Sequence, residues 1–139
     1  MAETKTGQGA ASNRPLSPHI QIYRPTINMV MSIVHRITGA ALYFGSLLLA
    51  WWLIAASVSA AYFNEVNTMF ATIPGKLVLF GYSWALIHHG LGGIRHFIWD
   101  TGAGFDLDRV DHMSWATIVG SVLLTAMLWL ATIGQWWGQ

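Results

Sequence analysis

No cysteine occurs among the 139 residues, and only 9% of the residues are charged. Without cysteine the chain can form no disulfide and cannot ligate an iron–sulfur cluster through thiolates. Soluble domains usually contain about 25% charged residues, so the shortage of charge indicates a protein that lies in lipid. The formal net charge of +1 gives no electrostatic basis for binding nucleic acid. The length is that of a single domain.

The first segment of the chain is polar, unlike the rest. Residues 1–19, MAETKTGQGAASNRPLSPH, contain no apolar run that would form the core of a secretory signal. We expect residues 1–27 to form a cytoplasmic N-terminal arm and residues 28–139 to form a transmembrane domain. Pro25 is expected just ahead of the first helix, because proline is poorly tolerated inside one.

Three long stretches contain no Asp, Glu, Lys or Arg. They cover residues 37–63, 77–94 and 113–137, which are 27, 18 and 25 residues long. A membrane-spanning helix needs about 20 mostly apolar residues. The sequence therefore predicts an all-α membrane protein with three transmembrane helices, at about residues 28–63, 76–99 and 113–137.

Two polar segments are expected to connect these helices. The first, NEVNTMFATIPGK at residues 64–76, contains the helix breakers Pro74 and Gly75. The second, DTGAGFDLDRVDH at residues 100–112, is rich in glycine and aspartate. Both are predicted to be loops.

The basic residues gather on one side of the membrane if the three helices alternate in direction. The arm, the second connection and the adjoining helix ends contain Lys5, Arg14, Arg24, Arg36, Arg95 and Arg109, whereas the other side has Lys76. Basic residues concentrate on the cytoplasmic side of membrane proteins. The N-terminus is therefore predicted to be cytoplasmic and the C-terminus periplasmic, in a bacterial inner membrane.

The segment LIHHGLGGIRHFIWD, residues 86–100, gathers three histidines, three glycines and an arginine at the end of the second predicted helix. His89 stands six residues before the arginine, about 9 Å below the membrane surface, where a polar side chain normally has a partner. His89, Gly93 and His96 share one helix face, and His88 lies about 100° away. The glycines could serve either close helix packing or the close approach of a flat ligand. Helix packing explains the histidines less well than haem binding does, since neutral imidazole is a good ligand for haem iron.

A second polar cluster occurs in SIVHRITG, residues 32–39, at the start of the first predicted helix. It places Ser32, His35 and Arg36 at about the same membrane depth as the histidines. These groups could hydrogen-bond a quinone carbonyl or bind haem propionates, because arginine offers a fork of donors to carboxylates. The alternative for Arg36 is an interfacial side chain that extends to lipid phosphate.

Three motifs resemble the cytochrome b subunits of succinate dehydrogenase, respiratory complex II. They are RPLSPHIQIYRP at 14–25, SIVHRITG at 32–39 and HGLGGIRHFIWD at 89–100, and they occur in the order found in that family. The resemblance implies a membrane anchor that packs with a second anchor subunit and holds an iron–sulfur subunit and a flavoprotein subunit. It implies that haem b lies between the two anchors and that electrons from succinate reach ubiquinone, while succinate is oxidised elsewhere in this oxidoreductase complex.

The resemblance also implies which residue ligates the haem iron. In the family motif this is the histidine four residues before Gly-Ile-Arg, which is His89 here. His88 is the rival for the same role. A dihaem cytochrome b is disfavoured, because it needs four buried ligands and only these two histidines lie well inside a predicted span.

Further residue roles are implied in the same way. Ser32 and Arg36 would border the quinone site, and His35 and Arg36 would approach the haem propionates. Arg95 and His96 are expected at the propionates or at lipid headgroups. Two alternatives stay open, namely a fumarate reductase-type anchor that works with menaquinone and a structural anchor without a cofactor.

Overall fold

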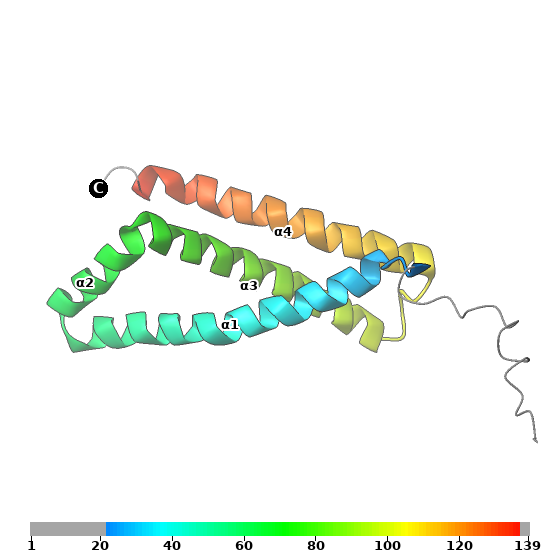
Figure 1. Ribbon diagram of the computed structural model, residues 1–139, viewed down its shortest axis with the longest axis horizontal. Coiled ribbons are helices and arrows are strands. Elements are labelled where there is room, and N and C mark those ends of the chain that lie inside the picture. Colours follow the sequence, from blue (N-terminus) through cyan, green and yellow to red (C-terminus); the bar gives the residue numbers. More distant parts are fainter. Residues whose placement is uncertain (1–21, 137–139) are drawn as a thin grey trace, which may run out of the picture.

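The computed structural model describes residues 22–136, with side chains as far as Thr132, and within that range it contains four helices and no strand. These are α1 (Ile27–Val58), α2 (Ala60–Ala71), α3 (Ile73–Asp100) and α4 (Leu107–Trp136) (Figure 1). Three segments are long and apolar enough to cross a membrane: Ile27–Val58, Ile73–Asp100 and Leu107–Thr132. The predicted all-α fold with three transmembrane helices is confirmed.

Helix α1 begins where the proline predicts. Thr26 is its N-cap residue and Ile27 its first helical residue, so Pro25 lies directly ahead of the cap. The predicted arm continues toward the N-terminus, but residues 1–21 lie outside the described part of the chain. Trp137, at the predicted end of the third span, also lies outside it.

The first helix ends at Val58, earlier than the predicted boundary at residue 63. Ser59 has an extended backbone (φ −165°, ψ 155°), and its side-chain oxygen accepts a hydrogen bond of 3.2 Å from the backbone N–H of Tyr62. Serine is a favoured N-cap because it satisfies one of the free N–H groups of a helix start. Ser59 therefore starts α2, and most of the segment predicted to be a loop is helical.

A single residue, Thr72, separates α2 from α3. Its hydroxyl oxygen caps α3 by accepting a hydrogen bond of 3.2 Å from the N–H of Gly75. Pro74 lies in the first turn of α3, where the missing N–H of proline costs nothing. A Cβ at position 75 would lie 2.7 Å from the carbonyl oxygen of Phe70, so only glycine fits this turn. The two expected loop breakers are thus the start of a helix.

The second connection is shorter than predicted, because α4 begins at Leu107 and not near residue 113. Gly102 and Gly104 have φ angles of 79° and 81°, a left-handed conformation that glycine adopts without strain. Asp108 lies in the first turn of α4, where the helix dipole favours a negative charge. Arg109 and Asp111, which belong to the segment predicted to be a loop, lie in the exposed first turns of this helix.

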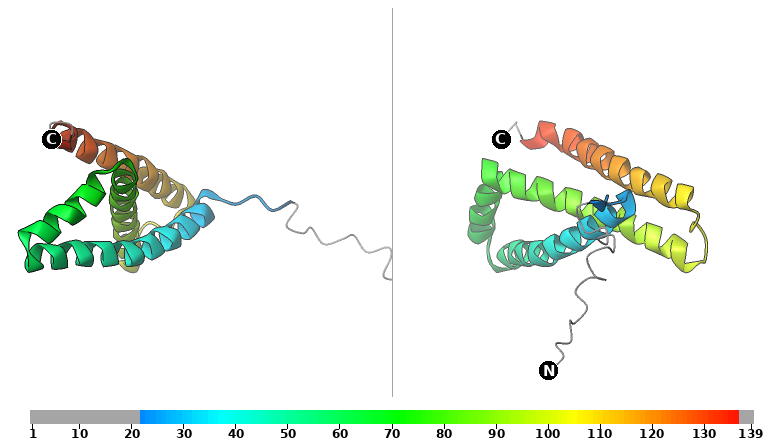
Figure 2. Two further views of the ribbon diagram at one scale, coloured as in Figure 1. Left: turned by 60° about the vertical axis from the view of Figure 1, so that its left-hand side comes forward. Right: turned by 45° about the vertical axis from the view of Figure 1, so that its right-hand side comes forward.

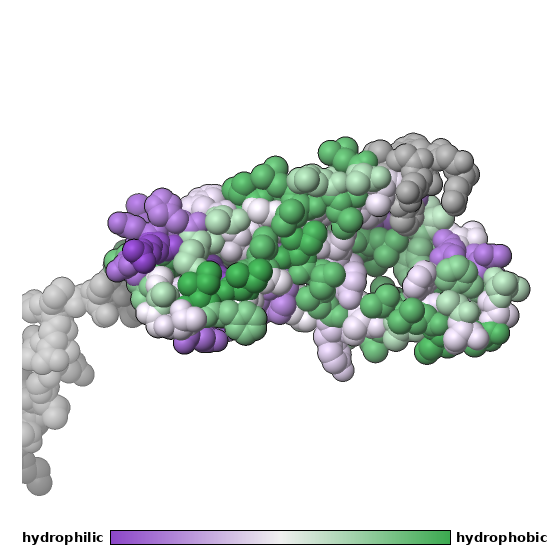
Figure 3. All heavy atoms as spheres, turned by 180° about the vertical axis from the view of Figure 1, so that it is seen from behind, coloured by the Kyte–Doolittle hydropathy of each residue, from purple (hydrophilic) through white to green (hydrophobic). Residues whose placement is uncertain are grey.

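Helix α3 is central and contacts each of the other helices. α2 joins the ends of α1 and α3, and α4 runs back along α3 (Figures 1 and 2). α1 and α4 approach each other at their N-terminal ends and diverge toward the other end (Figure 1). On the face shown in Figure 3, apolar side chains cover the middle of the molecule and polar ones gather at its two ends, as expected for a membrane-spanning bundle.

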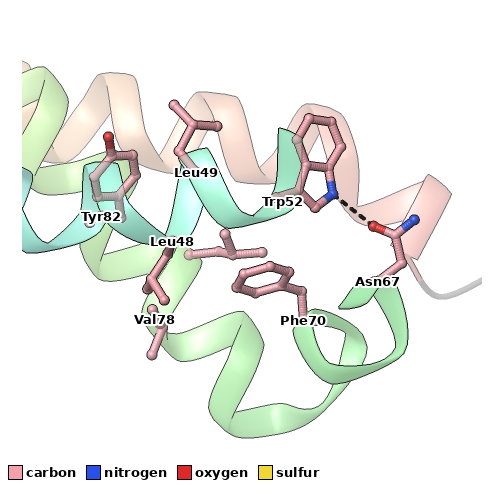
Figure 4. A pocket seen from close by; sticks show the side chains of 9 residues that line it. Leu48, Leu49, Trp52, Asn67, Phe70, Val78 and Tyr82 are labelled. Atoms are coloured by element: carbon pink, nitrogen blue, oxygen red, sulfur yellow. Dashed lines mark hydrogen bonds between the residues drawn. The ribbon is translucent and has the colours of Figure 1, made fainter. Parts of the chain in front are cut away.

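Helix α2 encloses an apolar cavity of about 370 Å³ with α1 and α3 (Figure 4). Its wall is formed by Gly45, Leu48, Leu49, Trp52, Asn67, Phe70, Val78, Leu79 and Tyr82. The indole N–H of Trp52 donates to the Asn67 side-chain oxygen at 2.9 Å, and that of Trp51 donates to the Tyr62 hydroxyl at 2.7 Å. These two tryptophans attach α2 to α1.

Substitution of Gly75 by alanine should lower the thermal stability of the detergent-solubilised protein. The added methyl group would meet the Phe70 backbone, and overpacking of this kind costs about 1–3 kcal/mol. The matched control is Gly81→Ala on the same helix, where a Cβ would meet nothing within 4 Å. Thermal unfolding followed by circular dichroism should show a lower midpoint for Gly75→Ala only. Equal losses in both variants would contradict the role given to Gly75.

Candidate functional site

A cavity of about 460 Å³ lies between the N-terminal part of α1 and the C-terminal part of α3. Its lining residues are Asn28, Met29, Ser32, His35, Arg36, Arg95, His96 and Trp99. Five of the six site residues expected from the sequence are therefore brought together from two helices. The lining contains two arginines, two histidines and a hydroxyl but no carboxylate. Such a wall suits a ligand that is anionic or that accepts hydrogen bonds.

The sixth expected residue, His89, lies directly behind this cavity. Its ring stacks on the ring of His35, with centroids 3.9 Å apart and planes inclined by 7°. Glycine makes this possible on both helices, because a Cβ at Gly39 would lie 3.1 Å from the His89 ring and a Cβ at Gly92 would lie 2.5 Å from the His35 ring. Each histidine thus lies over a glycine of the opposite helix.

The hydrogen bonds of His89 determine which of its nitrogens carries the proton. Nδ1 lies 3.2 Å from the backbone carbonyl oxygen of His35 and 3.3 Å from the hydroxyl oxygen of Thr38. A carbonyl oxygen only accepts, so Nδ1 carries the hydrogen and Nε2 keeps its lone pair. Metal-ligating histidines are commonly held in this way by a carbonyl at the other nitrogen.

His88 points to the other side of α3. Its Nδ1 lies 3.1 Å from the Ser121 hydroxyl oxygen on α4, its ring lies 5.1 Å from that of Trp84, and it is only 2% exposed. It is a packed, hydrogen-bonded histidine. His89, by contrast, is half-buried.

Arg95 is an unusual member of the cavity wall because it is only 4% exposed. Its Nη1 donates to the hydroxyl oxygen of Ser114 at 2.9 Å, and its guanidinium carbon lies 4.9 Å from the ring centre of Trp99. Ser32 and Arg36, by contrast, are exposed on α1 one turn apart. The cavity thus has one buried cation, Arg95, and one exposed cation, Arg36.

Several residues of the site were missed by the sequence analysis. Thr38, which contacts His89, stands three residues after His35, and that spacing could have identified it. Asn28 could have been found one turn before Ser32. Ser114 belongs to α4, and no local spacing connects it to Arg95.

Within the described residues, no three His, Cys, Asp or Glu side chains gather in a way that would hold a metal ion. A metal centre built from several such side chains of this part of the chain is therefore not supported.

Comparison with known proteins gives one consistent result. The family model described as "Succinate dehydrogenase/Fumarate reductase transmembrane subunit" matches residues 10–128. The succinate dehydrogenase cytochrome b556 subunit of Rickettsia conorii is 41% identical over 91% of this chain and 99% of its own length. That of Paracoccus denitrificans is 42% identical over 83% and 88%. The mitochondrial cytochrome b560 subunit of Sus scrofa is 37% identical over 84% and 72%.

The ring stack should be sensitive to Gly92. Gly92→Ala would push the His35 ring away from His89, because the new Cβ would lie 2.5 Å from His35 Nδ1. Gly93→Ala is the control, since a Cβ there meets nothing within 4 Å. In histidine-labelled protein we expect the ring NMR signals of His35 and His89 to move in Gly92→Ala and to stay in Gly93→Ala. Unmoved signals in Gly92→Ala would show that the rings do not stack.

Proposed function

The chain belongs to the succinate dehydrogenase/fumarate reductase transmembrane subunit family, and we propose that it is the haem b-binding membrane anchor of a succinate:ubiquinone oxidoreductase. In this role it binds haem b together with a second anchor subunit and helps to form the site of ubiquinone reduction. It also anchors the iron–sulfur and flavoprotein subunits. The observation that carries the proposal is the carboxylate-free cavity of arginine, histidine and serine side chains beside His89.

The residues present fit haem b. His89 would hold the haem iron through Nε2, because Nδ1 is engaged by the His35 carbonyl. The cavity side chains His35, Arg36, Arg95 and His96 offer donors of the kind that haem propionates need. Outside the bundle, a Cβ at Gly90 or Gly93 would meet nothing within 4 Å, which leaves that face of α3 open to a flat ligand or a partner helix. Bound haem supplies a one-electron redox centre.

Ser32 and Arg36 are the proposed quinone-binding residues. Both line the cavity from α1, and both donate hydrogen bonds. Hydrogen-bond donors directed at a carbonyl oxygen stabilise the negative charge that develops on it. We therefore assign these two side chains to orienting a ubiquinone carbonyl while the quinone takes up two electrons and two protons.

The distribution of basic residues along the bundle supports a cytoplasmic N-terminus. Four arginines, Arg24, Arg36, Arg95 and Arg109, belong to the end of the bundle that holds the cavity, and Lys76 belongs to the opposite end. By the positive-inside rule the cavity end faces the cytoplasm of a bacterial inner membrane. The relatives are named as succinate dehydrogenase subunits, which favours succinate oxidation over a fumarate reductase direction.

The haem assignment is tested by visible spectroscopy of the purified complex. His89→Leu should abolish or alter the b-type signal in a reduced-minus-oxidised spectrum, since it removes the proposed ligand. His88→Leu is the matched control on the adjacent residue, and its b-type signal should remain. Subunit content is checked on a gel, so that loss of assembly is not mistaken for loss of haem. A signal lost only in His88→Leu would transfer the ligand to that residue, and no signal in the wild type would favour the cofactor-free anchor.

The quinone assignment is tested by two activities of the same complex. Ser32→Ala removes one neutral hydrogen bond, about 1 kcal/mol, and should lower quinone reduction about fivefold. Arg36→Leu removes a charged donor, about 1.5–3 kcal/mol, and should lower it about 10- to 100-fold. Electron transfer from succinate to a soluble dye should be unchanged in both variants. If the two activities fall together, these residues act on assembly and not on the quinone.

A further inference from the structure

Ser114 lies where three helices meet beside the cavity. It belongs to α4, it is completely buried, and its hydroxyl oxygen accepts a hydrogen bond of 2.9 Å from Arg95 Nη1 on α3. The same oxygen lies 3.2 Å from the side-chain oxygen of Asn28 on α1 and 2.8 Å from the carbonyl oxygen of Val110. Arg95 and Asn28 both line the cavity, whereas Ser114 does not.

The Ser114 hydroxyl has one hydrogen and two lone pairs. The shorter contact, to the Val110 carbonyl one turn back on α4, takes the hydrogen. One lone pair accepts from Arg95, and the Asn28 side-chain oxygen, 3.2 Å away, is a second and longer acceptor for the same hydrogen. The Ser114 hydroxyl thus contacts α1, α3 and its own helix at once, which fixes Ser114 and the Arg95 side chain that donates to it.

The guanidinium of Arg95 is held from two directions but is not saturated. Ser114 binds Nη1, and the Trp99 ring lies 4.9 Å from the guanidinium carbon. Arg95 Nε is buried and has no hydrogen-bond partner within the described residues. Buried donors of this kind normally have a partner, so the Arg95 guanidinium keeps a hydrogen-bond donor that Ser114 does not use.

We infer that Ser114 is a positioning residue, which holds the Arg95 guanidinium against the cavity so that its positive charge acts on an anionic group bound there. This inference rests on the proposed function, which identifies that group as a haem propionate. Ser114 itself does not touch the ligand. Its effect is transmitted through Arg95, and Asn28 ties the same hydroxyl to α1.

The charge of Arg95 should affect the midpoint potential of the haem. Oxidised haem carries one more positive charge than reduced haem, so a nearby fixed cation disfavours the oxidised form and raises the midpoint potential. Without the Ser114 hydroxyl, the buried Nη1 loses its partner, and the guanidinium must move to satisfy it. The midpoint potential should then fall.

The experiment is a redox titration of the b-type signal in the purified complex. Ser114→Ala should lower the midpoint potential, and Ser114→Cys, which replaces the hydroxyl by a larger and weaker acceptor, should lower it less. The matched control is Thr117→Val. Thr117 lies on the same buried face of α4, and its hydroxyl bonds to the Met113 carbonyl of its own helix at 2.8 Å. This variant should titrate like the wild type.

Arg95→Gln tests the placement of Arg95 at the haem separately from the positioning role of Ser114. It removes the charge and should lower the midpoint potential at least as much as Ser114→Ala. A shift in Arg95→Gln with an unchanged or raised value in Ser114→Ala would overturn the positioning role and leave the proposed function intact. No shift in either variant would overturn both the positioning role and the placement of Arg95 at the haem. Equal shifts in Ser114→Ala and Thr117→Val would show a general effect of loosening α4.

Discussion

The close contact between α1 and α3 is the constraint on which the site depends. Glycine stands on both sides of it, and each histidine ring occupies the space that a Cβ of the opposite helix would take: His35 lies over Gly92, and His89 lies over Gly39. The stacked rings follow from this, as does the 3.2 Å contact of His89 with the His35 backbone carbonyl. With larger residues at the crossing the helices would separate, and the cavity wall would be divided between two distant surfaces.

The contact between α3 and α4 allows polar side chains to be buried at membrane depth. Four hydroxyls follow one face of α4, and each donates its hydrogen to a carbonyl of its own helix; they belong to Ser114, Thr117, Ser121 and Thr125. Their lone pairs then face α3, where Arg95 and His88 supply donors to Ser114 and Ser121. The two contacts are seven residues apart on each helix, so they repeat in register. An acceptor stripe on α4 therefore makes a buried arginine and a buried histidine tolerable on α3.

The helices and the cluster of site residues could be predicted from the sequence because they depend on local patterns. Uncharged runs identified the three spans, and helical spacing placed Ser32 and Arg36 on one face of α1. The prediction of a loop between the first two spans was wrong for a physical reason. Ser59 caps α2 and Thr72 caps α3, so the segment is helical. The twelve residues of α2 include Asn64, Glu65 and Asn67, which makes the helix look like a polar loop in sequence. Ser114 could not be predicted, since its relation to Arg95 depends on how α4 rotates against α3. Long-range register of this kind is not encoded in any local spacing.

The two adjacent histidines show how one helix can serve two neighbours. Consecutive residues of an α-helix point about 100° apart, so a central helix with α1 on one side and α4 on another sends His88 to Ser121 and His89 to the His35 carbonyl. The ring of His88 is enclosed on the α4 side of α3, and the ring of His89 lies on the α1 side. In both rings Nδ1 is the engaged nitrogen, but the Nε2 of His88 is buried while His89 is only half-buried. Identical side chains at neighbouring positions thus differ in their chemistry, because the helix that each one faces decides whether its free lone pair can be reached.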